Sequence, residues 1–185
     1  MGSVMEDVME NAIDTALAFV LAMALVAPAT AQTPSLEAFD TGPVFEEFGP
    51  HAPVDGASTI PSLSRFDIAF DVADVAKEGA RNRSFESAAR FINMHAAAGV
   101  SLDRMNLAVV VHGRAVTDLV SGQANRSEPM VRAMLERGVR FIVCGQSAAA
   151  YGVRAEQLIE GVEMQISAMT AHALLQQDGY TVNPF

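Results

Sequence analysis

The chain has 185 residues, and its 22 acidic side chains outnumber its 12 Lys and Arg residues, which gives a formal charge of −10. This length suits one domain. The charge argues against nucleic-acid partners and anionic membrane surfaces, because binding to either needs clustered Lys and Arg residues. The single cysteine, Cys144, excludes an intramolecular disulfide and any Cys-rich zinc or iron–sulfur site within one chain.

Residues 1–31 have most features of a secretory signal peptide. An uncharged apolar run from Thr15 to Ala27 has the length of a signal-peptide core and is too short to cross a bilayer, and a small-residue cleavage pattern ends at Ala31. The first 14 residues are atypical because they carry four acidic side chains and no Lys or Arg. The alternative is an ordinary N-terminal helix. We expect a periplasmic or secreted mature protein without stable membrane insertion after cleavage.

Residues 32–64, called here the Pro-rich arm, contain five of the eight prolines of the chain. So many prolines prevent a long helix or a central strand, so an extended and irregular segment is expected. Phe39, Val44, Phe45 and Phe48 lie within it. Because a fully solvated linker does not need such apolar groups, part of the arm should lie along the folded domain.

Residues 65–185 alternate between strand and helix patterns. Phe66–Asp71 alternates apolar and polar residues, as a half-buried strand does, and Met105–Val111 is a continuous apolar run typical of a strand covered on both faces. The predicted strands are 66–71, 105–111, 139–143, 162–166 and 180–182. The predicted helical segments are 84–98, 115–120, 129–137, 146–151, 155–159 and 167–177. This order predicts an α/β fold, a three-layer α/β/α domain with a parallel, roughly five-stranded sheet.

Three predicted strands end in polar or reactive side chains, namely Asp71, His112 and Cys144. Ligands of parallel sheets bind at these carboxyl ends. Cys144 also stands at the entrance to a helical segment, where backbone N–H groups stabilise a thiolate, so it is the best candidate nucleophile. His112 is the candidate proton carrier beside it. The alternatives are a buried structural cysteine and a structural histidine, both of which are common.

The sequence lacks the motifs of several other classes of functional site. The sequence contains no G-x-G-x-x-G, no G-x-x-x-x-G-K-[ST] and no G-x-S-x-G motif, so dinucleotide, P-loop and hydrolase functions are not indicated. No two histidines have the i, i+3 or i, i+4 spacing of a metal site. We therefore predict no metal and no cofactor.

From about Phe66 to the C-terminus the sequence resembles the DsrE/DsrF-like family, specifically its exported single-domain members. The resemblance is carried by Phe66-x5-Val72, Asn93, Val109-Val-Val-His-Gly113, Gly138-Val-x-Phe-x-Val-Cys144, Gly152-Val153, Leu158-x-x-Gly161-Val162 and Gly179-Tyr180. It implies a three-layer domain that forms homo-oligomers, often trimers or hexamers. It also implies that Cys144 matches the family's candidate sulfur-carrying cysteine, which transfers sulfur between proteins as a persulfide.

The first hypothesis is therefore a sulfur-relay protein with sulfurtransferase-like chemistry, which carries a persulfide on Cys144 and exchanges it with a donor or acceptor protein. Gly145 would allow close backbone approach, and Gln146 and Ser147 would donate hydrogen bonds. The candidate ligand-binding residues are Asp71, Asn93, Gly113, Gly145, Gln146 and Ser147.

Two alternatives stay open. The first is a non-catalytic oligomeric binding or assembly module in which Cys144 is structural. The second, weaker alternative is a redox sensor that dimerises through Cys144, because an unpaired cysteine in an oxidising compartment can form an intermolecular disulfide.

Overall fold

Five parallel strands form one sheet in the order β4-β3-β2-β1-β5. The structure, a computed structural model, describes residues 36–183, so the predicted signal peptide lies outside the described residues. The strands are Phe66–Val72 (β1), Met105–Val111 (β2), Arg140–Cys144 (β3), Glu163–Gln165 (β4) and Thr181–Asn183 (β5).

The helices connect these strands. The α-helices are Arg83–Ala97 (α2), Glu128–Glu136 (α3), Gly145–Ala150 (α4) and Ala168–Gln177 (α5). Three 3-10 helices add Leu102–Arg104 (η1), Gly113–Leu119 (η2) and Ala155–Gln157 (η3). No helix within residues 36–183 combines the length and the apolar character needed to cross a membrane.

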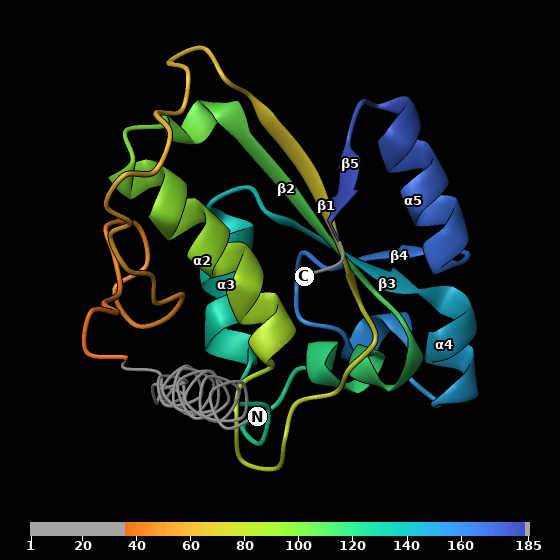
Figure 1. Cartoon of the computed structure of the whole chain (residues 1–185). Helices are drawn as coiled ribbons and strands as arrows, with labels where there is room; N and C mark the ends of the chain where they lie inside the picture. The colour runs from red at the N-terminus through yellow and green to blue at the C-terminus, as the bar shows by residue number, and fades with distance from the viewer. Residues whose placement is uncertain (1–35, 184–185) are drawn as a thin grey trace, which may run out of the picture. The chain divides into compact units, whose positions relative to one another are not determined.

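Helices cover both faces of the sheet, with α2 and α3 on one side and α5 on the other (Figure 1). The predicted three-layer α/β/α fold with a parallel five-stranded sheet is confirmed. Each central strand is buried on both faces because its successive side chains point alternately to one helix layer and to the other. In β2, for example, Val109 and Val111 pack toward α2 and α3, whereas Ala108 and Val110 pack toward α5.

The two apolar layers differ in size. The layer under α2 and α3 contains large side chains such as Phe70, Phe85 and Phe141. The layer under α5 is small, and its buried members are Ala69, Ala108, Val110, Ile142, Ala171 and Leu175. The burial of apolar area therefore holds α5 to the sheet less strongly than it holds α2.

The structure differs from the predicted elements mainly between β2 and β4. The helical segment predicted at 115–120 is a 3-10 helix that ends at Leu119. Before β2, the short 3-10 helix η1 was not predicted. Val120 instead pairs with Leu158 in an isolated antiparallel bridge, and Ile159 N–H donates to the carbonyl of Leu119. These long-range hydrogen bonds hold the backbone extended at a point where local pattern alone favours a helix.

Part of the Pro-rich arm packs on α2 through a buried amide. The Asn93 side chain is fully buried, and its Nδ2 group lies 3.0 Å from the carbonyl oxygens of Phe45, Phe48 and Gly49. Its Oδ1 atom accepts hydrogen bonds from the backbone N–H groups of Val44 and Phe45. A short irregular segment thus gains the backbone hydrogen-bond partners that it would otherwise find in water.

The same segment approaches α2 so closely that one position requires glycine. Gly49 has φ +71°, and a Cβ atom added there would lie 2.7 Å from the carbonyl carbon of Ala89 and from the backbone nitrogen of Arg90. Gly56, also in the arm, has φ +75° but no atom within 4 Å of such a Cβ. The two glycines share a left-handed backbone and differ only in the space around them.

We predict that Gly49→Ala lowers the free energy of unfolding by about 2 kcal/mol or more, because the new methyl group must push the arm away from helix backbone. Gly56→Ala is the matched control and should cost about 1 kcal/mol, the cost of a left-handed alanine alone. Chemical denaturation of both variants measures the difference. Equal losses of stability would contradict the close packing of the arm on α2.

Candidate functional site

The three polar strand ends predicted from the sequence meet on one face of the sheet. β1, β2 and β3 are neighbours, with Asp71 in register with Val110 and Val111 in register with Val143. Asp71 and Cys144 follow the alternation of the residues that pack toward α5, and His112 hydrogen-bonds to Asp71. All three therefore lie at the carboxyl edge of the sheet on the α5 side.

Cys144 is the last residue of β3, and only 5% of its surface is exposed. It is also the N-cap of α4, although its side chain makes no capping hydrogen bond. The register pairs Cys144 with Gln165 of the edge strand β4, and β4 leads into α5. The thiol thus lies between the beginnings of two helices.

Hydrogen bonds to the sulfur lower the thiol pKa. Burial by itself would raise the pKa of Cys144, but the hydroxyl of Ser147 and the backbone N–H groups of Ser147, Ala168 and Gln146 outweigh it. Ser147 Oγ accepts a hydrogen bond from the Gly113 N–H at 2.9 Å, so the hydroxyl proton is available for the sulfur. The arrangement stabilises a thiolate without a nearby cation.

Gly145 allows this approach between α4 and the β4–α5 connection. A Cβ atom at this position would lie 2.9 Å from the carbonyl oxygen of Gln165 and 3.3 Å from that of Ile166. The Gln146 side chain is exposed, and its Nε2 lies 3.4 Å from the carbonyl oxygen of Ile166. The Gln146 amide, predicted to donate a hydrogen bond to the sulfur, is instead directed at the Ile166 carbonyl.

Asp71 binds two histidines from different elements. His172 Nε2, on α5, lies 2.8 Å from Asp71 Oδ1, and His112 Nε2 lies 3.3 Å from Asp71 Oδ2. Partial burial would raise the pKa of Asp71, but the hydrogen bonds from His172 and His112 lower it below its ordinary value. A carboxylate accepts but does not donate, so both Nε2 atoms carry the proton.

His172 belongs to this cluster, although no pattern in the sequence predicts its place there. It is 101 residues from Asp71 and is one of two helical histidines in the chain that have no partner at metal-binding spacing. The one local sign was its position in the first half of a helix that follows the β4 strand. Only the packing of α5 on the sheet brings the two side chains together.

Asn93 is separated from the other predicted site residues. It lies on α2, on the opposite face of the sheet, where its amide holds the Pro-rich arm. Gly113 does belong near Cys144, because its N–H binds Ser147. Within residues 36–183 no group of three or more His, Cys, Asp or Glu residues has a geometry that could hold a metal ion.

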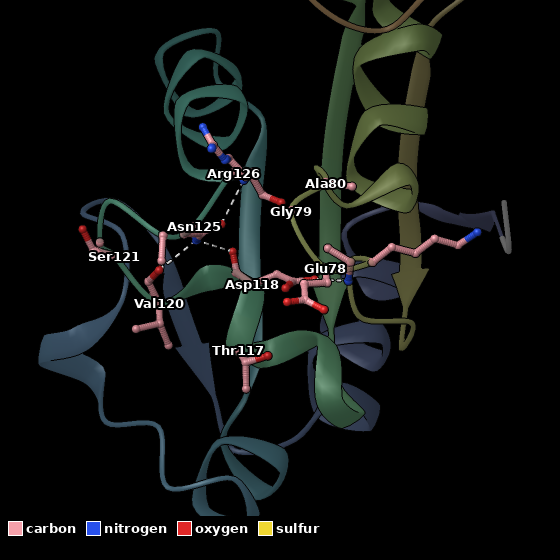
Figure 2. Close-up of a pocket in the computed structure, with 14 residues that line it drawn as sticks. Glu78, Gly79, Ala80, Thr117, Asp118, Val120, Ser121, Asn125 and Arg126 are labelled. Atoms are coloured by element: carbon pink, nitrogen blue, oxygen red, sulfur yellow. Dashed lines mark hydrogen bonds between the residues drawn. The ribbon is translucent and has the colours of Figure 1, made fainter.

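A separate cavity of about 360 Å³ opens between the β1–α2 connection, η2 and the segment before α3 (Figure 2). The polar side chains of this cavity bind other residues around it. Asp118 Oδ2 accepts one hydrogen bond from the Ala76 N–H and another from Asn82 Nδ2, and both distances are 2.7 Å. Figure 2 shows Asn125 directed at Asp118 and Val120, whose carbonyl oxygens are each 2.8 Å from its Nδ2. None of the predicted site residues lines this cavity.

Comparison with known proteins identifies the family. The profile of the DsrE/DsrF-like family matches residues 67–184, which is more than half of the chain. The chain belongs to the DsrE/DsrF-like family. This family is associated with sulfur relay.

Two solved structures are similar to this DsrE/DsrF-like protein. MTH1491 from Methanobacterium thermoautotrophicum, described as a protein of unknown function, is 22% identical, with a TM-score of 0.51 over 64% of this chain and 97% of its own. The ychN protein from E. coli is 16% identical, with a TM-score of 0.44 over 66% of this chain and 100% of its own. The first likeness supports the fold alone. A comparison with curated proteins found no match.

The polar groups around Cys144 predict a thiol pKa below that of an unperturbed cysteine. Ser147→Ala removes the hydroxyl and keeps the backbone N–H groups, so the pKa of the Cys144 thiol should rise. Because the chain has one cysteine, the ultraviolet absorbance of the thiolate reports on Cys144 once the signal of a Cys144→Ser variant is subtracted.

The matched control is Ser87→Ala, which removes an exposed hydroxyl on α2 and should leave the thiol pKa unchanged. A wild-type thiol that titrates at or above the value of an unperturbed cysteine would contradict the description of the site.

Proposed function

We propose that this protein is a sulfur carrier that holds sulfane sulfur as a persulfide on Cys144. The observation that carries the proposal is the place of Cys144 at the end of β3 and the start of α4, where neighbouring polar groups hold the pKa of its thiol below the ordinary value. Membership of a family associated with sulfur relay supports the same function. The reaction needs a stable but nucleophilic thiolate, and no metal takes part in it.

The loading step is a displacement at sulfur. The Cys144 thiolate attacks the outer sulfur of a donor persulfide, R–S–SH, so that a new S–S bond forms while the S–S bond of the donor breaks. The donor leaves as the thiolate R–S⁻, and Cys144 becomes Cys–S–SH. The number of S–S bonds is unchanged, so no oxidant is required.

Discharge is the same reaction in the opposite direction. The thiolate of an acceptor attacks the outer sulfur, takes it as a new persulfide, and releases the Cys144 thiolate. The donors that lower the thiol pKa also stabilise this leaving group, and a thiol of lower pKa leaves faster. One set of hydrogen bonds therefore assists both loading and discharge.

The second candidate function is a non-catalytic assembly module, and two observations favour it. Cys144 is 5% exposed, which limits access to the sulfur. Apolar side chains next to it are exposed instead, since Ile166 is 65% and Met169 is 80% exposed. Such residues are typical of surfaces that bind another protein.

We further propose that the protein assembles as a homo-oligomer and acts in the periplasm or outside the cell. The resemblance to exported DsrE/DsrF-like members and the apolar run of residues 15–27 support these two proposals. A sulfur donor or acceptor protein would then be the second partner.

The test is to expose native protein to a low-molecular-weight persulfide and to record its intact mass. We expect a gain equal to one sulfur atom on the wild-type chain, because the lowered thiol pKa favours the thiolate that attacks the donor, and loss of that gain when a free thiol is added. Cys144→Ser should show no gain.

Native and denatured protein treated with a thiol-alkylating reagent distinguish the two functions. A carrier reacts in the native state, whereas a structural thiol reacts only after denaturation. A folded wild-type protein that gains no sulfur and resists alkylation would falsify the carrier proposal and favour the assembly module.

A further inference from the structure

His112 and Cys144 follow neighbouring strands at the same level of the sheet. β2 and β3 pair in register up to Val111 and Val143, and each chain continues by one residue, to His112 and to Cys144. The backbone of His112 is still extended, with φ −140° and ψ −175°, and its N–H donates to the carbonyl of Val72 at 2.9 Å. Because neighbouring strands lie about 4.8 Å apart, His112 and Cys144 are adjacent, and both side chains are on the α5 side.

A second contact joins the same two segments. The Gly113 N–H, next to His112, donates to Ser147 Oγ at 2.9 Å. Ser147 lies three residues after Cys144, in the first turn of α4. The chain that follows His112 is therefore held against the chain that follows Cys144.

The imidazole of His112 is arranged as a proton acceptor. Its Nε2 atom lies 3.3 Å from Asp71 Oδ2, and because a carboxylate only accepts, Nε2 carries the proton and Nδ1 keeps a lone pair. His172 on α5 binds the other oxygen of Asp71 at 2.8 Å, which fixes the carboxylate. A base that a third group orients beside a nucleophile is the usual arrangement of nucleophilic sites.

Exposure indicates which proton this ring can move. Cys144 is 5% exposed, whereas the side chain of His112 is 33% exposed. A thiol that approaches the sulfur along this edge of the sheet therefore meets the imidazole as well. A free thiol has a pKa of about 8.5, so at neutral pH it is mostly protonated and must lose its proton before it attacks.

We propose that His112, oriented by Asp71, carries the proton of the thiol that exchanges sulfur with Cys144. The proposal rests on the proposed function, because it assigns a role in the discharge and loading of the persulfide. Asp71 is a positioning residue, since it acts through the ring of His112.

In discharge, Nδ1 of His112 takes the proton of the acceptor thiol, R–SH. The sulfur of the acceptor forms a bond to the outer sulfur of the persulfide, and the S–S bond to Cys144 breaks. The products are R–S–SH, the Cys144 thiolate and the imidazolium. In the next loading step the imidazolium returns the proton to the thiolate that leaves the donor, so protons balance over the cycle.

The test measures how fast the full chain, loaded with one sulfur atom, transfers it to free cysteine at different pH values, with intact mass as the readout. His112→Gln keeps an amide donor for Asp71 but has no group that titrates. At pH 7 this variant should discharge at least about tenfold more slowly than the wild type, because general base catalysis typically contributes about 100-fold or more. At about pH 10 the two rates should converge, because the acceptor is then already a thiolate.

Asp71→Asn tests the orientation of the ring. The new amide can donate to Nε2, which moves the ring proton to Nδ1, so discharge at pH 7 should slow as well. His51→Gln is the matched control and should leave the rate unchanged, because His51 lies in the Pro-rich arm, where its backbone binds Asp40. Circular dichroism verifies that each variant is folded.

Equal discharge rates for the wild type and His112→Gln at pH 7 would overturn the proposal. A deficit of the same size at about pH 10 would also overturn it, because such a deficit indicates a structural role instead of proton transfer. The failure of each proposal is recognisable. Wild-type protein that loads no sulfur contradicts the carrier function and the proton role with it, whereas protein that loads sulfur and discharges at one rate in both forms contradicts the role of His112 alone.

Discussion

The two-residue repeat of the β-strands is the constraint on which the site depends. Side chains alternate between the faces of a sheet, so the residues that end neighbouring strands share a face only if their registers agree. Here Asp71 and Cys144 both continue the alternation of small apolar residues that pack toward α5. A shift of one residue in either strand would turn that side chain toward α2 and α3, away from the N-terminus of α5.

Cys144 combines burial with a stabilised anion, and these two properties usually oppose each other. Burial in apolar surroundings favours the neutral thiol, which is inert. In this protein the sulfur is shielded from solvent, while Ser147 and nearby backbone N–H groups hold the pKa of the thiol below its ordinary value. Nearby, the backbone of Ile166 lies close to Gly145, and the apolar side chains of Ile166 and Met169 are exposed. The same surface can therefore serve both a sulfur carrier and a protein that assembles with others.

The two faces of the sheet differ in the side chains that they carry. The α2–α3 face holds the large apolar cluster and binds part of the Pro-rich arm through Asn93 and the close approach of Gly49. The α5 face has a small apolar layer and carries the polar strand ends. Because the large cluster supplies most of the buried apolar area, the α5 face can hold polar and reactive groups at little cost to the fold.

The sequence alone determined the order of strands and helices along the chain, the parallel sheet and the place of Cys144 at a strand end. These features follow from local signals, namely the hydrophobic periodicity of each element and the glycines that end helices. It also indicated Asp71 and His112 as strand-end groups. Tertiary structure alone decided that His172 binds Asp71, that Gly113 donates its N–H to Ser147, and that Asn93 holds the arm. These contacts join residues that are far apart in the chain or depend on how a helix is rotated about its axis. A local sequence pattern predicts neither property.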